Sequence, residues 1–88
     1  MTKLTSRVIK VNQRHTSMRL CCKEWSALDE VCAREQISRS DLFSLIENNK
    51  NNKLGLAYAT RLFLLLYYQS LAMPSKHKHA AAIIKELA

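Results

Sequence analysis

The fold is decided by one short stretch near the N-terminus, which reads His15-Thr16-Ser17-Met18-Arg19-Leu20. Polar and apolar residues alternate along it, which is the pattern of a β-strand with one buried face. Met18 and Leu20 then share one face, while Ser17 and Arg19 share the other. We expect a half-buried strand that presents a polar face to solvent or to a partner.

The segment before this strand is less definite. Residues 5–13 contain Val8, Ile9 and Val11 among polar neighbours, followed by Asn12-Gln13. The pattern allows two interpretations, a short strand that turns near Asn12-Gln13 or an extended arm. We therefore treat residues 1–14 as a basic N-terminal arm or strand.

Helical spacing begins after the strand. Trp25, Leu28, Val31 and Cys32 recur at helical intervals, which predicts a helix from Lys23 to about Gln36. Ser38, with Asp41 three residues later, has the pattern of an N-cap. It predicts a second helix from about Arg39 to Asn49, whose apolar side is Leu42, Phe43, Leu45 and Ile46. The strand, both helices and the polar stretch that follows the second helix form a predicted core unit over residues 15–52.

A third, very apolar helix is expected within residues 53–73, from near Gly55 to before Pro74. Its apolar residues run nearly all round, which predicts burial on most sides. Arg61 lies near its centre and argues against a membrane span, because a central Arg costs about 2.5–3.5 kcal/mol on insertion scales. Residues 74–88 are expected to form a basic tail or short helix.

The charges point to a polyanionic partner. The chain of 88 residues has 14 Lys and Arg against 7 Asp and Glu, a net charge of +7. Residues 1–23 contain no acid, and their basic residues are Lys3, Arg7, Lys10, Arg14, Arg19 and Lys23. Solubility alone does not explain this segregation, which phosphate contact accounts for better.

The sequence gives little support for disulfide bonds, metal binding or catalysis. Three cysteines, Cys21, Cys22 and Cys32, form an odd set without a CxxC motif, so we expect free thiols in the cytoplasm. His77 and His79 stand two residues apart, which places them on different helix faces, and no metal or other cofactor is expected. No nucleophile, base and orienting group are recognisable together, so we expect no enzyme.

The order of strand, helix and capped helix resembles the ribbon-helix-helix family, the Arc and MetJ class of bacterial repressors. Besides residues 15–20, the resemblance is carried by Trp25-Ser26-Ala27-Leu28, Ile37-Ser38-Arg39-Ser40-Asp41-Leu42 and Ala59-Thr60-Arg61-Leu62-Phe63-Leu64-Leu65. It is closest to a subfamily with an extended N-terminal segment and a third helix. Gln36 replaces the glycine that many relatives have between the helices, and Gly55 replaces a polar capping residue.

The resemblance implies a mainly α protein with a short N-terminal β-strand, in which two chains form an intertwined homodimer. Their strands would pair into an intermolecular two-stranded antiparallel ribbon that enters the major groove of double-stranded DNA. Base contacts are then expected from Arg19, Ser17 and His15. The buried side of the dimer is expected to contain Met18, Leu20, Trp25, Leu28, Leu42 and Ile46.

Phosphate contacts are expected around this ribbon. The N-terminus of the second helix offers free amides and its positive dipole end, so Ser38, Arg39 and Ser40 are candidates. The basic residues that flank the strand, Lys10, Arg14 and Lys23, complete the set.

The function expected first is sequence-specific DNA binding by a transcriptional repressor. One alternative is an antitoxin whose C-terminal segment wraps a toxin protein, and another is a protein-interaction module without a DNA role. The apolar helix also leaves open a tetramer formed through Leu56–Leu71. No membrane partner is expected.

Overall fold

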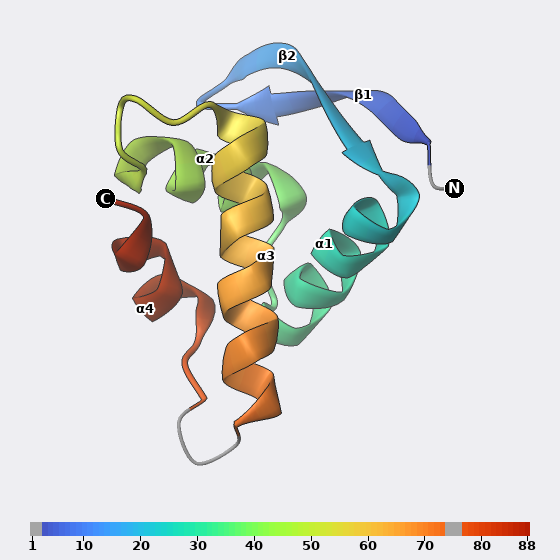
Figure 1. The fold of residues 1–88 in the computed structure, drawn as a ribbon. Helices are drawn as coiled ribbons and strands as arrows, with labels where there is room; N and C mark the ends of the chain where they lie inside the picture. Colours follow the sequence, from blue (N-terminus) through green and yellow to red (C-terminus); the bar gives the residue numbers. More distant parts are fainter. Residues whose placement is uncertain (1–2, 74–76) are drawn as a thin grey trace.

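The computed structural model describes residues 3–73 and 77–88 and places a β-hairpin across one end of a group of helices (Figure 1). In chain order the elements are β1 (Leu4–Val11), β2 (Arg14–Cys21), α1 (Cys22–Glu35), α2 (Arg39–Asn49), α3 (Leu56–Ala72), α4 (Ala80–Ile84) and a 3-10 turn (Lys85–Leu87). Residues 74–76, with which the predicted tail begins, lie outside the described residues.

The hairpin joins β1 and β2 through Asn12 and Gln13, the position where a turn was predicted. The strands pair antiparallel from Leu4 opposite Cys21 to Val11 opposite Arg14. Asn12 and Gln13 have φ angles of 49° and 66°. Positive φ at both central residues gives a two-residue turn the twist that matches the right-handed twist of the flanking strands. The N-terminal segment is therefore a strand rather than an arm over residues 4–11.

The partner of β2 differs from the sequence-based expectation. We expected the ribbon to join identical strands of two chains, but β2 pairs here with β1 of the same chain. A two-residue loop closes at very little entropic cost, so local pairing satisfies one edge of β2 without a second molecule. β1 was not expected in this role from the sequence.

The inner face of the hairpin covers a core to which every described helix contributes. Ile9 and Val11 of β1 and Met18 and Leu20 of β2 are buried against the helices. The six residues expected in a dimer core are all buried by this one chain: Met18, Leu20, Trp25, Leu28, Leu42 and Ile46. α4 adds Ala80, Ile83 and Ile84 to the same cluster, and the 3-10 turn adds Leu87.

The helix ends follow the local sequence. The Ser38 hydroxyl accepts a hydrogen bond from the Asp41 amide at 3.0 Å, which confirms the predicted cap of α2. Gln36 has a φ of 53° in the turn between α1 and α2, the left-handed conformation in which glycine is favoured. Gly55 precedes α3 without a side-chain cap.

α3 is less enclosed than predicted. Phe63, Leu64 and Tyr67 are buried, but Tyr58 and Leu65 keep 59% and 56% of their surface exposed. One side of α3 therefore faces solvent in the single chain. Within the described part of the chain, no helix is both long enough and apolar enough to cross a membrane.

Candidate nucleic-acid interface

The two faces of the hairpin have opposite character. Side chains opposite each other across the strands share a face, and the pairs alternate between inward and outward. Beyond the Leu4–Cys21 pair at the open end of the hairpin, the outward pairs are Ser6 with Arg19, Val8 with Ser17, and Lys10 with His15, and all six of these residues are exposed. We call these six residues the outer face.

The outer face contains every residue for which base contact was predicted. Arg19, Ser17 and His15 form the β2 row, and they point away from Met18 and Leu20 as the alternation predicted. Lys10, predicted as a phosphate contact, lies in the β1 row directly beside His15. The outer face contains two cations and no acid, so it fits a surface that accepts base edges and phosphates.

Two members of the outer face were missed by the sequence analysis. Ser6 and Val8 belong to β1, which was left as either arm or strand. Their exposure follows only once β1 is paired with β2, because the pairing register sets which side chains face outward.

Each edge of the hairpin is held by a different helix. On the β1 side, the Ser40 hydroxyl of α2 donates to the Lys10 carbonyl at 3.2 Å. On the β2 side, the Arg61 guanidinium of α3 donates to the Arg19 carbonyl at 3.4 Å. These bonds fix the backbone beneath the two principal cations of the outer face and leave both side chains exposed.

The turn is also fixed by α2. The Asn12 amide donates to the Ser44 hydroxyl at 2.9 Å, and the Asn12 side-chain amide donates to the Asn48 side-chain oxygen at 2.9 Å. The hairpin is therefore a rigid platform, which a base-reading surface needs.

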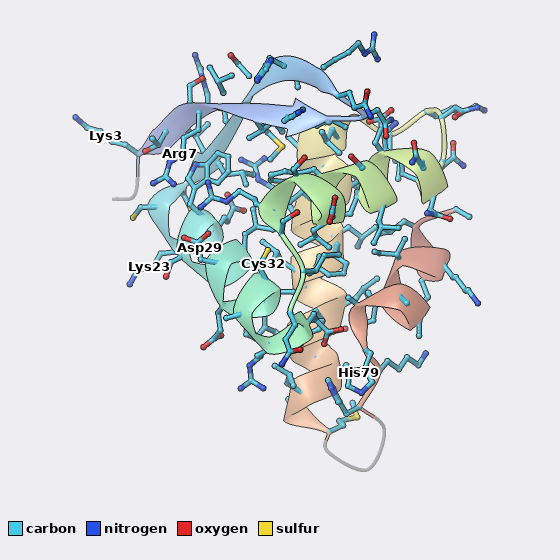
Figure 2. All side chains as sticks on the ribbon, turned by 180° about the vertical axis from the view of Figure 1, so that it is seen from behind. Lys3, Arg7, Lys23, Asp29, Cys32 and His79 are labelled. Carbon is cyan, nitrogen blue, oxygen red and sulfur yellow. The ribbon has the colours of Figure 1, made fainter. Side chains whose placement is uncertain are left out.

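The predicted phosphate contacts other than Lys10 lie at the start of α2, at the hairpin turn and at the start of α1, and one of them already has a partner. Ser38 and Ser40 are at the N-terminus of α2, beside β1. Arg14 starts β2 at the turn, and Lys23 extends from the first turn of α1 at the opposite end of the hairpin (Figure 2). Arg39 is already engaged in the free chain, because it forms an ion pair with Asp29.

Trp25 connects the hairpin to the helices. Its indole N–H donates to the Thr5 carbonyl at 3.0 Å, and its ring lies in a T-shaped contact with Phe43. The guanidiniums of Arg7, labelled in Figure 2, and of Arg39 lie over the indole, with 5.0 and 5.5 Å respectively from the guanidinium carbon to the ring centroid. Arg7 is thereby placed beside the start of α2, and the sequence analysis did not include it among site residues.

A carboxylate anchors the base of the hairpin without reaching its outer face. Glu24 accepts from the Cys21 amide at 2.9 Å and from Arg61 Nε at 3.0 Å. Burial acts to raise the pKa of Glu24, but the bonds from Cys21 and Arg61 outweigh it and hold the pKa below its ordinary value. The acid therefore remains ionised and neutralises Arg61.

The charge of the outer face is not cancelled within the chain. Arg39, Arg61, Lys50 and Lys78 form ion pairs with carboxylates. Across residues 3–73 and 77–88, no ion pair involves Lys10, Arg14, Arg19 or Lys23. These cations are therefore available to phosphates, and so are Arg34, Lys53 and Lys85, which also form no ion pair among the described residues.

Other chemistry is not assembled in the described residues. No group of three His, Cys, Asp or Glu residues is placed there to hold a metal ion. The three cysteines are free, and burial raises the pKa of the Cys32 thiol, which keeps it in its less reactive protonated form.

Comparison with known proteins identifies the family. A sequence model described as the ribbon-helix-helix domain matches residues 4–68, which cover both strands and the first two helices with most of α3. No curated protein and no solved structure matches. The chain belongs to the ribbon-helix-helix family, and this DNA-binding, non-enzymatic family confirms that the protein is not an enzyme.

Proposed function

We propose that this ribbon-helix-helix protein binds double-stranded DNA sequence-specifically through the outer face of its hairpin and acts as a transcriptional repressor in the cytoplasm of a bacterium. The observation that carries the proposal is the outer face itself, which combines cations and small polar groups without an acid. A two-stranded ribbon has the width that the major groove admits.

Two kinds of contact follow from the geometry. Arg19 is suited to bidentate bonding with guanine O6 and N7, and Ser17 and His15 offer further donors and acceptors at base edges. The start of α2, with Ser38 and Ser40, offers amides to one phosphate strand. The remaining phosphate contacts are proposed for Lys10, Arg14, Lys23 and Arg39, with Arg39 exchanging Asp29 for a phosphate.

Assembly belongs to the same proposal. Ribbon-helix-helix proteins typically bind DNA as dimers, and we propose a homodimer here as well. The exposed side of α3, with Tyr58 and Leu65, supports a contact between copies, including the tetramer considered from the sequence. The antitoxin alternative has less support, because Ile83, Ile84 and Leu87 of the tail are buried in the chain's own core.

Selection of duplexes from a random library tests the proposal. We expect one preferred sequence to emerge, bound with an affinity that falls steeply with salt, by about 0.9 log units per log unit of salt for each phosphate neutralised. Anionic lipid vesicles serve as the control for charge attraction alone. Recovery of a random pool, or equal binding to vesicles, would contradict sequence-specific binding.

A further inference from the structure

The two strands of the hairpin carry the same pattern nine residues apart. Ile9, Lys10 and Val11 of β1 correspond to Met18, Arg19 and Leu20 of β2. In each triplet the outer two side chains are buried and the central cation is exposed. An unpaired arm would not need this repetition.

The register turns the repetition into an approximate two-fold symmetry. Val8 lies directly opposite Ser17, and exchanging the strands about this pair brings Lys10 onto the position of Arg19. The buried residues obey the same exchange, since Ile9 takes the place of Met18 and Val11 takes the place of Leu20. β1 therefore occupies, within one chain, the position that an identical strand from a second chain would hold.

The support at the two edges follows the same symmetry. The Lys10 carbonyl accepts from Ser40 of α2, and the corresponding Arg19 carbonyl accepts from Arg61 of α3. Both edges are thus fixed by helices of this chain at equivalent points.

We propose that β1 is the second reading strand of a ribbon formed within one chain, and that Val8 and Lys10 contact base edges beside Ser17 and Arg19. This inference rests on the proposed DNA binding. Lys10, assigned above to a phosphate, then reads guanine acceptors instead, as Arg19 does, while the two rows differ at the centre, where Val8 faces Ser17. The β1 row and the β2 row of the ribbon therefore prefer different bases.

Val8 gives this proposal its most specific test. It is 70% exposed, the most exposed large hydrophobic side chain among the described residues, and it lies at the symmetry centre of the outer face. β-propensity alone explains a valine in a strand, but it implies no base preference. In the major groove, the apolar group that meets an exposed valine is the C5-methyl of thymine.

Thymine-to-uracil exchange in the selected duplex tests this contact, because it removes only the methyl group. For the wild type we expect one position where uracil weakens binding about fourfold, the value of one buried methylene of about 0.8 kcal/mol. Val8→Ser should bind the thymine and uracil duplexes equally. Leu45→Ala, which shortens a 40% exposed leucine on α2, is the control and should keep the fourfold difference.

A second variant keeps the test independent of any loss of strand stability. Lys10→Ala at an exposed position should reduce discrimination between the selected duplex and a duplex with one guanine replaced, and Lys53→Ala should not. Altered preference in either β1 variant supports the proposal. If the wild type selects a duplex but both variants keep its full base preference, β1 does not read DNA and the inference is overturned. If the wild type selects no duplex, the proposed function itself has failed.

Discussion

The two ends of the molecule use their polar residues in opposite ways. At the hairpin end, Lys10, Ser17 and Arg19 project from a fixed backbone and their side chains make no ion pair among the described residues. At the far end, where Figure 2 shows His79, polar groups of α1, α3 and the start of α4 bind each other. Exposed cations without ion pairs indicate a surface that binds a partner. Polar groups that hydrogen-bond to each other indicate a structural contact, and we call the contact between α1, α3 and α4 the closure.

The closure is built around one carboxylate. Glu35 accepts from the Tyr67 hydroxyl at 2.8 Å, from the Ala80 amide at 3.1 Å and from His79 Nδ1 at 3.3 Å. Desolvation and the bond to Glu35 raise the pKa of Tyr67 to about 12, so its hydroxyl remains a donor at neutral pH. Substitutions at the closure should change stability, and substitutions on the outer face should change DNA recognition.

The largest effect is expected beneath the hairpin. Leu20 is fully buried, so Leu20→Asp places a charge where no partner compensates it and should cost more than about 4 kcal/mol of unfolding free energy. Chemical denaturation followed by circular dichroism measures the loss. The control is Ser17→Asp on the exposed side of the same strand, which should remain folded. Equal stability of the two variants would contradict the assignment of the faces.

A smaller effect is expected at the closure. Glu35→Gln should lower the unfolding free energy by about 1–3 kcal/mol, because hydrogen bonds to a charged acceptor are replaced by bonds to a neutral one. DNA discrimination should be unchanged, since Glu35 ends α1 and contacts His79, which Figure 2 shows at the end of the molecule away from the hairpin. If Glu35→Gln lost DNA discrimination but kept its full unfolding free energy, the closure would serve recognition and not stability, contrary to our account.

The same carboxylate predicts a dependence on pH. Burial acts to raise the pKa of Glu35, but the bonds from Ala80, Tyr67 and His79 outweigh it and hold the pKa below its ordinary value of 4.5. A lowered pKa in the folded state stabilises the protein above pH 4.5, and this contribution disappears as the pH falls through the folded-state value. Acid titration of the melting temperature should show a smaller decline for Glu35→Gln than for the wild type. Identical declines would exclude Glu35 as a source of acid sensitivity.

The smallest change in stability is expected on the open side of α3. Leu65 is 56% exposed and Leu64 is 6% exposed, so Leu65→Lys should change the unfolding free energy by at most about 0.5 kcal/mol, while Leu64→Lys should destabilise strongly. If copies associate through α3, Leu65→Lys should also reduce the mass measured by sedimentation. An unchanged mass would exclude this side of α3 from assembly.

The sequence predicted the elements well where a local signal defined them. The alternation around Met18 and Leu20 predicted β2 and its two faces, and Ser38 with Asp41 predicted the start of α2 at Arg39. The positions of Arg19, Ser17 and His15 on one exposed row followed from the same alternation.

The missing parts depend on pairing and on tertiary contacts. Nothing in the alternation of β2 specifies whether its partner strand comes from the same chain, so Ser6 and Val8 were missed. The ion pair of Arg39 with Asp29 was also not predicted, because it forms only when α1 and α2 pack together. One signal in the sequence could have identified β1 as a strand like β2. Lys10 stands between two apolar residues, as Arg19 does.

The most direct test of the account compares Arg19→Ala with the wild type on the selected duplex and on a scrambled one, by fluorescence anisotropy. We expect the affinity for the selected duplex to fall by about 5- to 150-fold for each Arg19 that contacts a base, the value of one bidentate contact of about 1–3 kcal/mol, so a homodimer that loses two contacts should show a larger fall. Non-specific affinity and melting temperature should be nearly unchanged. Arg34→Ala, an exposed arginine at the end of α1, should leave the discrimination intact. If Arg19→Ala retains full discrimination between the two duplexes, the outer face of the hairpin does not read DNA and the central claim is wrong.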